Sequence, residues 1–265
     1  MKRSNFKERF LTQMKQHKKS FILYLVLRVL VIITMILQLI NGNYENVFFC
    51  FLTLILFIIP SVIEMKLSVK LPDTLEIIIL LFIFSAEILG EIQNFYNIFT
   101  HWDTILHTLN GFLCAAIGFS MIDILNRTDK FHINLTPLFV AIVGFCFSMT
   151  IGVMWEFFEY GSDYLIKTDM QKDRLVTNVS SVYLNPDGLN TPIKIKDIDK
   201  TVIISDETEY TIDGGYLDIG ITDTMKDLTV NFIGAVIFCS IGYFYVKKRG
   251  EGGFAKNFLL EFVSK

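Results

Sequence analysis

Charged residues are scarce in this chain of 265 residues, where Asp, Glu, Lys and Arg together make up 19%. Soluble proteins average about 25%, whereas the apolar fraction here is 52% and includes 25 Phe. The apolar residues gather in runs long enough to cross a bilayer, which excludes a disordered protein and an ordinary soluble enzyme. The net charge of −3 leaves no basic surplus for binding nucleic acid. The sequence is that of a multi-span membrane protein.

Cysteine is also rare. The four cysteines are Cys50, Cys114, Cys146 and Cys239, and each falls within an apolar run. This placement predicts small core side chains and argues against a disulfide framework or a zinc site built from thiolates.

Six apolar segments approach the ~20 residues that a helix needs to cross the hydrocarbon core. They are Phe21–Ile40, Val47–Ile63, Leu75–Gly90, Thr104–Leu125, Leu138–Tyr160 and Thr224–Val246. The third is the shortest and carries Glu76 and Glu87. We therefore expect an all-α polytopic membrane bundle of six transmembrane helices.

The basic residues predict the orientation of these helices. Residues 1–20 carry seven Lys and Arg, and Lys247, Lys248 and Arg249 follow the last segment. Because cytoplasmic loops collect Lys and Arg, both termini are expected inside. We expect residues 1–20 to include an amphipathic helix on the inner leaflet, with Phe6, Phe10 and Met14 along one face. Residues 248–265 are expected to form a cytoplasmic tail, and its Phe254–Val263 stretch could also lie on the membrane.

Residues 164–222 have a different composition from the spans. Val, Ile, Thr and Tyr dominate, and turn signals recur at residues 185–188 and 213–215. Leu175–Leu184, Thr201–Ile204 and Glu209–Ile212 are predicted strands of a small antiparallel sheet. We expect an extracytoplasmic β-rich insert, acting as a lid or cap, between spans one to five (residues 21–163) and span six (residues 223–247).

Polar residues interrupt the last three spans at helical spacing, so that each set lies on one helix face. The three sets are Asp103, His107 and Asn110; Glu156, Glu159 and Asp163; and Asp223, Asp227 and Asn231. Spans four and six enter from outside and span five exits there, which brings the three stripes to the same side. At ~1.5 Å rise per residue, His107, Glu159 and Asp227 share a depth of roughly 6–8 Å.

Carboxylates inside a membrane cost ~2.5–3.5 kcal/mol each, and neighbouring ones repel each other. A divalent metal or a proton-sharing network would remedy both. The residues predicted to bind a metal are His107, Glu156, Glu159 and Asp227, and those predicted to support it are Asp103, Asn110, Asp163, Asp223 and Asn231. Carboxylate and imidazole ligands suit Mg²⁺, Mn²⁺, Fe²⁺ or Zn²⁺. A single histidine among many oxygens argues against a structural zinc site.

Structural explanations compete with this site. Asp103, Asp163 and Asp223 lie at the membrane boundary, where a carboxylate is tolerated and can cap a helix. Asn110 and Asn231 are equally consistent with hydrogen bonds that join helices. The glycines one residue after Asn110 and three after Asn231, Gly111 and Gly234, indicate positions of close helix packing.

The polar motifs resemble those of a known group of proteins. The motifs are Asp-x-x-x-His (Asp103, His107), Glu-x-x-Glu (Glu156, Glu159) and Asp-x-x-x-Asn-x-x-Gly (Asp227, Asn231, Gly234). Their order resembles the VanZ-like membrane proteins of bacteria and, more closely, the YjdF-type family. The likeness covers roughly residues 80–245, although Glu159 stands where VanZ-like proteins often have Gln and the insert is extra. It implies a multi-pass protein of the bacterial cytoplasmic membrane without an established activity.

Three functions fit these observations. The first is a metal-dependent hydrolase or transferase acting on a lipid or lipid-linked envelope precursor, with Glu156 and His107 as catalytic acid or base. The second is a non-enzymatic binding or structural protein, an accessory in envelope stress or resistance, whose insert binds a partner. The third is a cation- or proton-coupled transporter, which the confinement of the acids to one end disfavours. The expected partners are membrane lipids and a lipid-linked substrate, and the sequence does not fix an oligomeric state.

Overall fold

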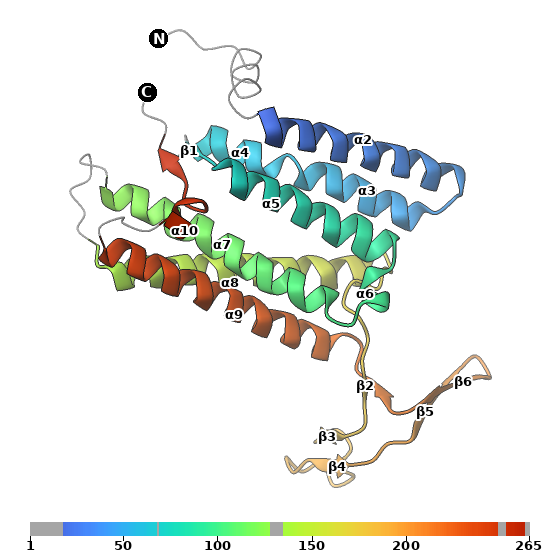
Figure 1. The fold of residues 1–265 in the computed structure, drawn as a ribbon. Coiled ribbons are helices and arrows are strands. Elements are labelled where there is room, and N and C mark those ends of the chain that lie inside the picture. Colours follow the sequence, from blue (N-terminus) through green and yellow to red (C-terminus); the bar gives the residue numbers. More distant parts are fainter. Residues whose placement is uncertain (1–17, 68, 128–134, 249–252, 263–265) are drawn as a thin grey trace. The chain divides into compact units, whose positions relative to one another are not determined.

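The computed structural model describes residues 18–67, 69–127, 135–248 and 253–262 (Figure 1). They divide into two compact units, one of residues up to Val153 together with those from Leu228, the other of Met154–Asp227. Both boundaries fall inside unbroken helices, α8 (Pro137–Leu165) and α9 (Ile221–Lys247). The predicted amphipathic helix with Phe6, Phe10 and Met14 lies outside the described residues.

Five of the described helices are long and apolar enough to cross a membrane. They are Ser20–Ile40, Tyr44–Lys66, Trp102–Leu125, Pro137–Leu165 and Ile221–Lys247. The first lies in α2 (Lys18–Ile40), the second combines α3 (Tyr44–Leu56) with α4 (Ile59–Leu67), and the third lies in α7 (Trp102–Arg127). These helices match five of the six predicted segments, and the protein is a mostly helical membrane protein.

The segment predicted as the third span is built differently from the others. Helix α5 (Asp73–Phe84) continues directly into the π-helix η1 (Ser85–Ile92). A π-helix is rare and often occurs at functional sites. It buries Glu87, which is 2% exposed, and one carboxylate oxygen of Glu87 has no hydrogen-bond partner among the described residues. The short helix α6 (Phe95–Ile98) then leads into α7.

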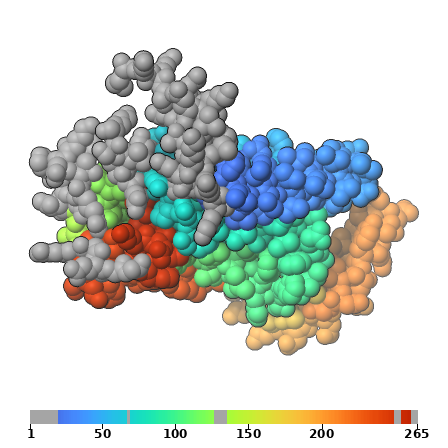
Figure 2. Space-filling model, turned by 45° about the horizontal axis from the view of Figure 1, so that its top comes forward, coloured from blue at the N-terminus to red at the C-terminus, as the bar shows by residue number. Residues whose placement is uncertain are grey.

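Helices α2, α3 and α5 pack around their own apolar core. Val31, Cys50, Phe57 and Leu80 are buried in it. The opposite face of α2 is exposed at residues such as Ile36, and Figure 2 shows this helix in blue at the molecular surface. An apolar face turned outward is expected where lipid is the solvent.

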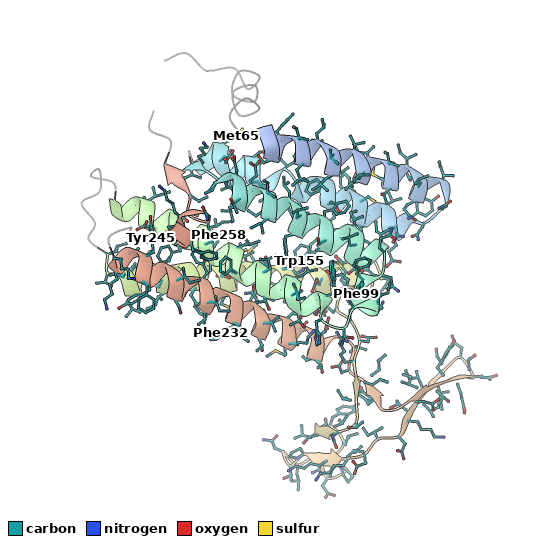
Figure 3. All side chains as sticks on the ribbon, viewed as in Figure 1. Met65, Phe99, Trp155, Phe232, Tyr245 and Phe258 are labelled. Carbon is teal, nitrogen blue, oxygen red and sulfur yellow. The ribbon has the colours of Figure 1, made fainter. Side chains whose placement is uncertain are left out.

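The C-terminal tail folds back into the first unit. It contains α10 (Gly253–Lys256) and β8 (Glu261–Phe262), and β8 pairs antiparallel with β1 (Val69–Lys70). Phe258 is 8% exposed, and the backbone N–H of Leu260 donates to Ser120 Oγ at 3.1 Å. Figure 3 shows Phe258 at the same end of the helices as Tyr245. Ala255, Phe258, Leu259 and Leu260 are buried in protein, whereas Phe254 is 57% exposed. The expectation that the Phe254–Val263 stretch lies on the membrane surface is therefore wrong for these four buried residues.

The second unit contains three two-stranded antiparallel sheets. Their pairs are β2 (Leu175–Val176) with β7 (Tyr216–Leu217), β3 (Val179–Ser181) with β4 (Ile193–Ile195), and β5 (Lys200–Ser205) with β6 (Thr208–Asp213). The β5–β6 hairpin contains the two strands predicted there. The single strand predicted over Leu175–Leu184 is instead two strands with different partners. The sheets confirm that this segment is rich in β-structure.

Candidate metal site

Helices α7 and α9 approach each other so closely that two positions require glycine. A Cβ atom on Gly111 would lie 2.0 Å from the backbone oxygen of Asn231, and one on Gly234 would lie 1.9 Å from that of Thr108. Small residues allow such backbone contact between helices in membranes. The prediction that Gly111 and Gly234 are close-packing positions is confirmed.

A pair of asparagines joins the same two helices. Asn110 Nδ2 donates to Asn231 Oδ1 at 2.9 Å, and Asn231 is only 1% exposed. Asn231 Nδ2 in turn lies 3.6 Å from the sulfur of Met149 on α8. Of the two roles weighed for these residues, the structure shows the interhelical hydrogen bond.

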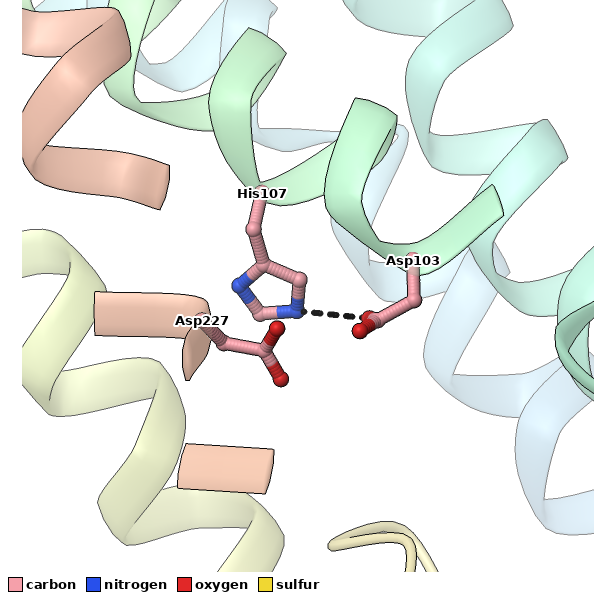
Figure 4. A group of neighbouring side chains, drawn as sticks. All are labelled: Asp103, His107 and Asp227. Carbon is pink, nitrogen blue, oxygen red and sulfur yellow. Dashed lines mark ion pairs between the residues drawn. The ribbon is translucent and has the colours of Figure 1, made fainter. Parts of the chain in front are cut away.

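Three residues that can bind a metal lie about one to two helical turns from this pair. Asp103 and His107 are on α7, and Asp227 is on α9, four residues before Asn231 and fixed to it by a continuous helix. Each of the three offers a ligand atom, and these atoms lie within 4.8 Å of one another. Figure 4 shows the carboxyl groups of Asp103 and Asp227 beside the imidazole of His107.

The group is shielded from solvent and carries opposing charges. His107 Nε2 lies 3.4 Å from Asp103 Oδ1, and their side chains are 12% and 13% exposed. Asp227 is 2% exposed and lies 3.7 Å from the ammonium of Lys226, which itself is 35% exposed. Two acids that share a poorly solvated place repel each other, so positive charge placed between them is stabilising.

The donor set suits a divalent cation. Two ligand atoms held at about 2.1 Å from a cation lie at most about 4.2 Å apart. The separations here would need to close by roughly half an ångström, which side-chain rotation can supply. Two carboxylates and one imidazole match the preferences of Mn²⁺, Fe²⁺ or Zn²⁺, and of Mg²⁺ through the carboxylates. The three residues therefore fit such an ion.

Two predicted ligands on α8 are not members of this group. Glu159 accepts a hydrogen bond of 2.8 Å from the indole of Trp155, one turn earlier on the same helix. Glu156 is buried, at 4% exposed. Asp103, which the sequence placed among the supporting residues, belongs to the group instead.

Other carboxylates at the ends of α8 and α9 hold the loop between them. Asp163 accepts from the backbone N–H groups of Met170 and Gln171. Asp223 accepts from the backbone of Lys172 and forms an ion pair of 2.7 Å with Arg174. The structure thus gives both acids a role in fixing the chain where it leaves and re-enters the helices.

Asp218 is a structural residue that the sequence analysis did not select. It accepts hydrogen bonds from the backbone N–H groups of Arg174, Gly220 and Thr222. Burial opposes ionisation, but these bonds together with one from the Thr222 side chain lower the pKa of Asp218. Partial burial and nearby acids, Asp169 first among them, raise the pKa of Asp173. The glycine at residue 220, which has a positive φ, is the local sequence signal for the turn that Asp218 stabilises.

Comparisons with known proteins agree with a membrane protein. A family model described as a predicted membrane protein (DUF2238) matches residues 22–248. An uncharacterised protein of Thermotoga maritima is 24% identical over 107 residues, which are 40% of this chain and 53% of that protein. The match thus spans about half of that relative, and no solved structure matches the chain. These findings give no support to the narrower VanZ-like name. The chain belongs to the DUF2238 family of predicted membrane proteins.

Proposed function

We propose that Asp103, His107 and Asp227 bind a divalent cation in a membrane-embedded site. The observation that carries this proposal is the convergence of three ligand atoms within 4.8 Å from two helices that are locked together by glycines. A rigid scaffold is what a metal site needs, because its ligands must be held near the productive geometry. The Asn110–Asn231 hydrogen bond fixes the two helices about one to two turns away.

We further propose that the site serves a hydrolase or transferase acting on a lipid or lipid-linked envelope precursor. A bound cation would polarise a substrate oxygen and lower the pKa of water. Glu156 is retained as the proposed general base because it is a buried acid on α8. A lipid substrate has a polar headgroup and an apolar tail. The polar site would meet the headgroup, and the apolar helices around it would meet the tail.

The proposed setting is the extracytoplasmic side of a bacterial cytoplasmic membrane. Six spans with both termini inside would place the ends of α7 and α9 that carry Asp103 and Asp227 on that side. This arrangement needs one span besides the five long helices. It is the third along the chain, formed by α5 together with η1 as a continuous stretch of residues 73–92. The distribution of Lys and Arg supports this orientation.

A turnover assay on the full chain tests the enzymatic proposal. Protein in proteoliposomes would be given phosphatidylglycerol or a polyprenyl diphosphate, with Mg²⁺, Mn²⁺ or Zn²⁺ or with chelator. We expect product formation that needs a metal, falls about 100-fold or more in His107→Ala and Asp227→Asn, and persists in Asp187→Asn, an exposed control. Protein that binds metal without any turnover would overturn the enzymatic proposal and leave the metal site standing.

A binding function is the second candidate, and the insert favours it. Two-stranded sheets are marginally stable by themselves, and the second unit exposes large apolar side chains in its strands and loops. Tyr183 is 92% exposed, Ile204 70% and Ile219 78%. Exposed apolar groups of this kind suit a partner. If Tyr183→Ser and Ile204→Ser abolish cross-linking to envelope components while metal content is unchanged, the insert binds a partner independently of the metal site.

A further inference from the structure

An apolar groove lies between α8 and α9, at the ends of these helices remote from the candidate metal site. Leu138, Ala141 and Phe145 line it from α8, and Ser240, Tyr243 and Phe244 from α9. Its volume is 410 Å³, within the range of about 300–1,000 Å³ typical of ligand sites. Leu138 and Phe244 are 59% and 57% exposed. The groove therefore opens on the outer surface of the helices, where lipid is the solvent.

Positive charge is concentrated at one end of this groove. The ammonium of Lys247 lies 5.7 Å from the centre of the Tyr243 ring, which is a wall of the groove. The next residue, Lys248, is also exposed and directly follows α9, its N–H donating to the backbone oxygen of Phe244. Two ammonium groups thus stand within one turn of the apolar lining.

The first turn of α8 adds to this charge. Leu138 belongs to that turn and lines the same groove as Phe244, so the N-terminus of α8 lies at the basic end. Thr136 caps the helix by accepting from the backbone N–H of Phe139 at 3.2 Å. The N-terminus of a helix of 29 residues carries partial positive charge and favours phosphate.

We propose that this groove binds one anionic glycerophospholipid of the cytoplasmic leaflet. An acyl chain would lie between α8 and α9, and the phosphate would meet Lys247, Lys248 and the start of α8. Basic pockets between transmembrane helices are known to bind anionic headgroups on this side of a membrane. A second copy of the chain is a poorer occupant, because a two-fold contact about an axis along the membrane normal would bring the two basic ends together.

Native mass spectrometry of the delipidated full chain tests this site. The chain would be titrated with phosphatidylglycerol and, separately, with phosphatidylcholine of the same acyl chains. We expect tighter binding of phosphatidylglycerol. Lys247→Gln combined with Lys248→Gln should weaken its binding about thirtyfold, since each basic residue near the surface contributes about a factor of five. Lys194→Gln with Lys196→Gln, exposed lysines of the insert, is the matched charge control.

A second variant tests the groove itself. Ser240→Leu would fill the groove with apolar atoms and should abolish tight binding of phosphatidylglycerol, whereas Thr150→Leu places the same side chain at an exposed position of α8 outside the lining. Unchanged thermal unfolding of each variant shows that the fold is kept. Equal binding of the two lipids, or binding unaffected by Ser240→Leu, would overturn the proposal. So would a dimer in wild type that Ser240→Leu dissociates, which would assign the groove to a second copy.

Discussion

Gly234 meets the backbone oxygen of Thr108 with no room for a methyl group, since a Cβ atom would lie 1.9 Å from that oxygen. The neighbouring atom belongs to the backbone, so the helices themselves would have to separate. This contact and the Gly111–Asn231 contact set the distance between α7 and α9, and hence the distance between the residues of the candidate metal site.

Adding a methyl group at this contact should loosen the helix pair. We expect Gly234→Ala to lower the free energy of unfolding by about 1–3 kcal/mol, as overpacking typically does, and to weaken metal binding as well. Thermal unfolding in detergent measures the first effect. Gly161→Ala is the control, because nothing lies within 4 Å of a Cβ there and alanine favours a helix by up to about 1 kcal/mol. Equal effects at the two positions would contradict the close-packing role.

The Asn110–Asn231 hydrogen bond should appear as an energetic coupling. We expect a double-mutant cycle with Asn110→Ala, Asn231→Ala and the pair to give a coupling of about 0.6 kcal/mol, the average for hydrogen bonds between membrane helices, and at most about 1.7 kcal/mol. The unfolding free energies of the four proteins in one detergent supply the measurement. Strictly additive losses would show that the two side chains do not stabilise each other.

Asp218 should stabilise the insert in a pH-dependent way. Because its pKa is lowered in the folded chain, its carboxylate contributes stability above the unfolded value of about 3.9, and this contribution is lost as the pH falls through the lowered pKa. We expect Asp218→Asn to destabilise the protein at pH 7 by about 1–3 kcal/mol, the cost of leaving buried donors unsatisfied. Thermal unfolding at pH 7 and pH 3 should show the difference from wild type shrinking at the lower pH.

Asp173 provides the control of opposite sign. Its pKa is raised by partial burial and by neighbouring acids, so its ionised form opposes folding at pH 7. Asp173→Asn should therefore stabilise the protein at pH 7, and this gain should vanish as the pH falls through the raised pKa. A loss of stability in Asp173→Asn at pH 7 would contradict this account of the loop.

Periodicity predicted the parts of this protein that local sequence encodes. Five apolar segments are helices of spanning length, and Gly111 and Gly234 do allow α7 to pack against α9. The spacing of Asp103 and His107 also placed them on one face of α7, where they pair. The helices and the Asp103–His107 pair depend on residues within a few turns of one another, which is why the sequence revealed them, whereas each glycine marked only its own helix as able to pack closely.

Contacts between distant residues escaped the sequence analysis. The tail around Phe258 is amphipathic. Periodicity alone does not show whether its apolar face lies against a membrane surface or, as in the structure, against the protein core. The switch from α5 to a π-helix has no sequence signature comparable to a proline or glycine. Glu159 was predicted to bind metal by its depth, but its hydrogen bond with Trp155 depends on side-chain rotamers. Asp163 and Asp223 were grouped with the polar stripes and weighed as helix caps, whereas the structure shows that they accept hydrogen bonds from the loop.

Metal content tests the central claim most directly. Detergent-purified protein, reconstituted with Mg²⁺, Mn²⁺ or Zn²⁺, would be measured by elemental mass spectrometry alongside folded Asp103→Asn, His107→Ala and Asp227→Asn. Glu156→Gln tests whether Glu156, a ligand predicted from the sequence, is needed for metal binding in addition to the three residues of the site. Asp187→Asn controls for nonspecific binding. We predict about one ion per chain in wild type, lost in the first three variants and kept in the last two. Wild-type protein without metal, or metal unaffected by His107→Ala and Asp227→Asn, would contradict the account.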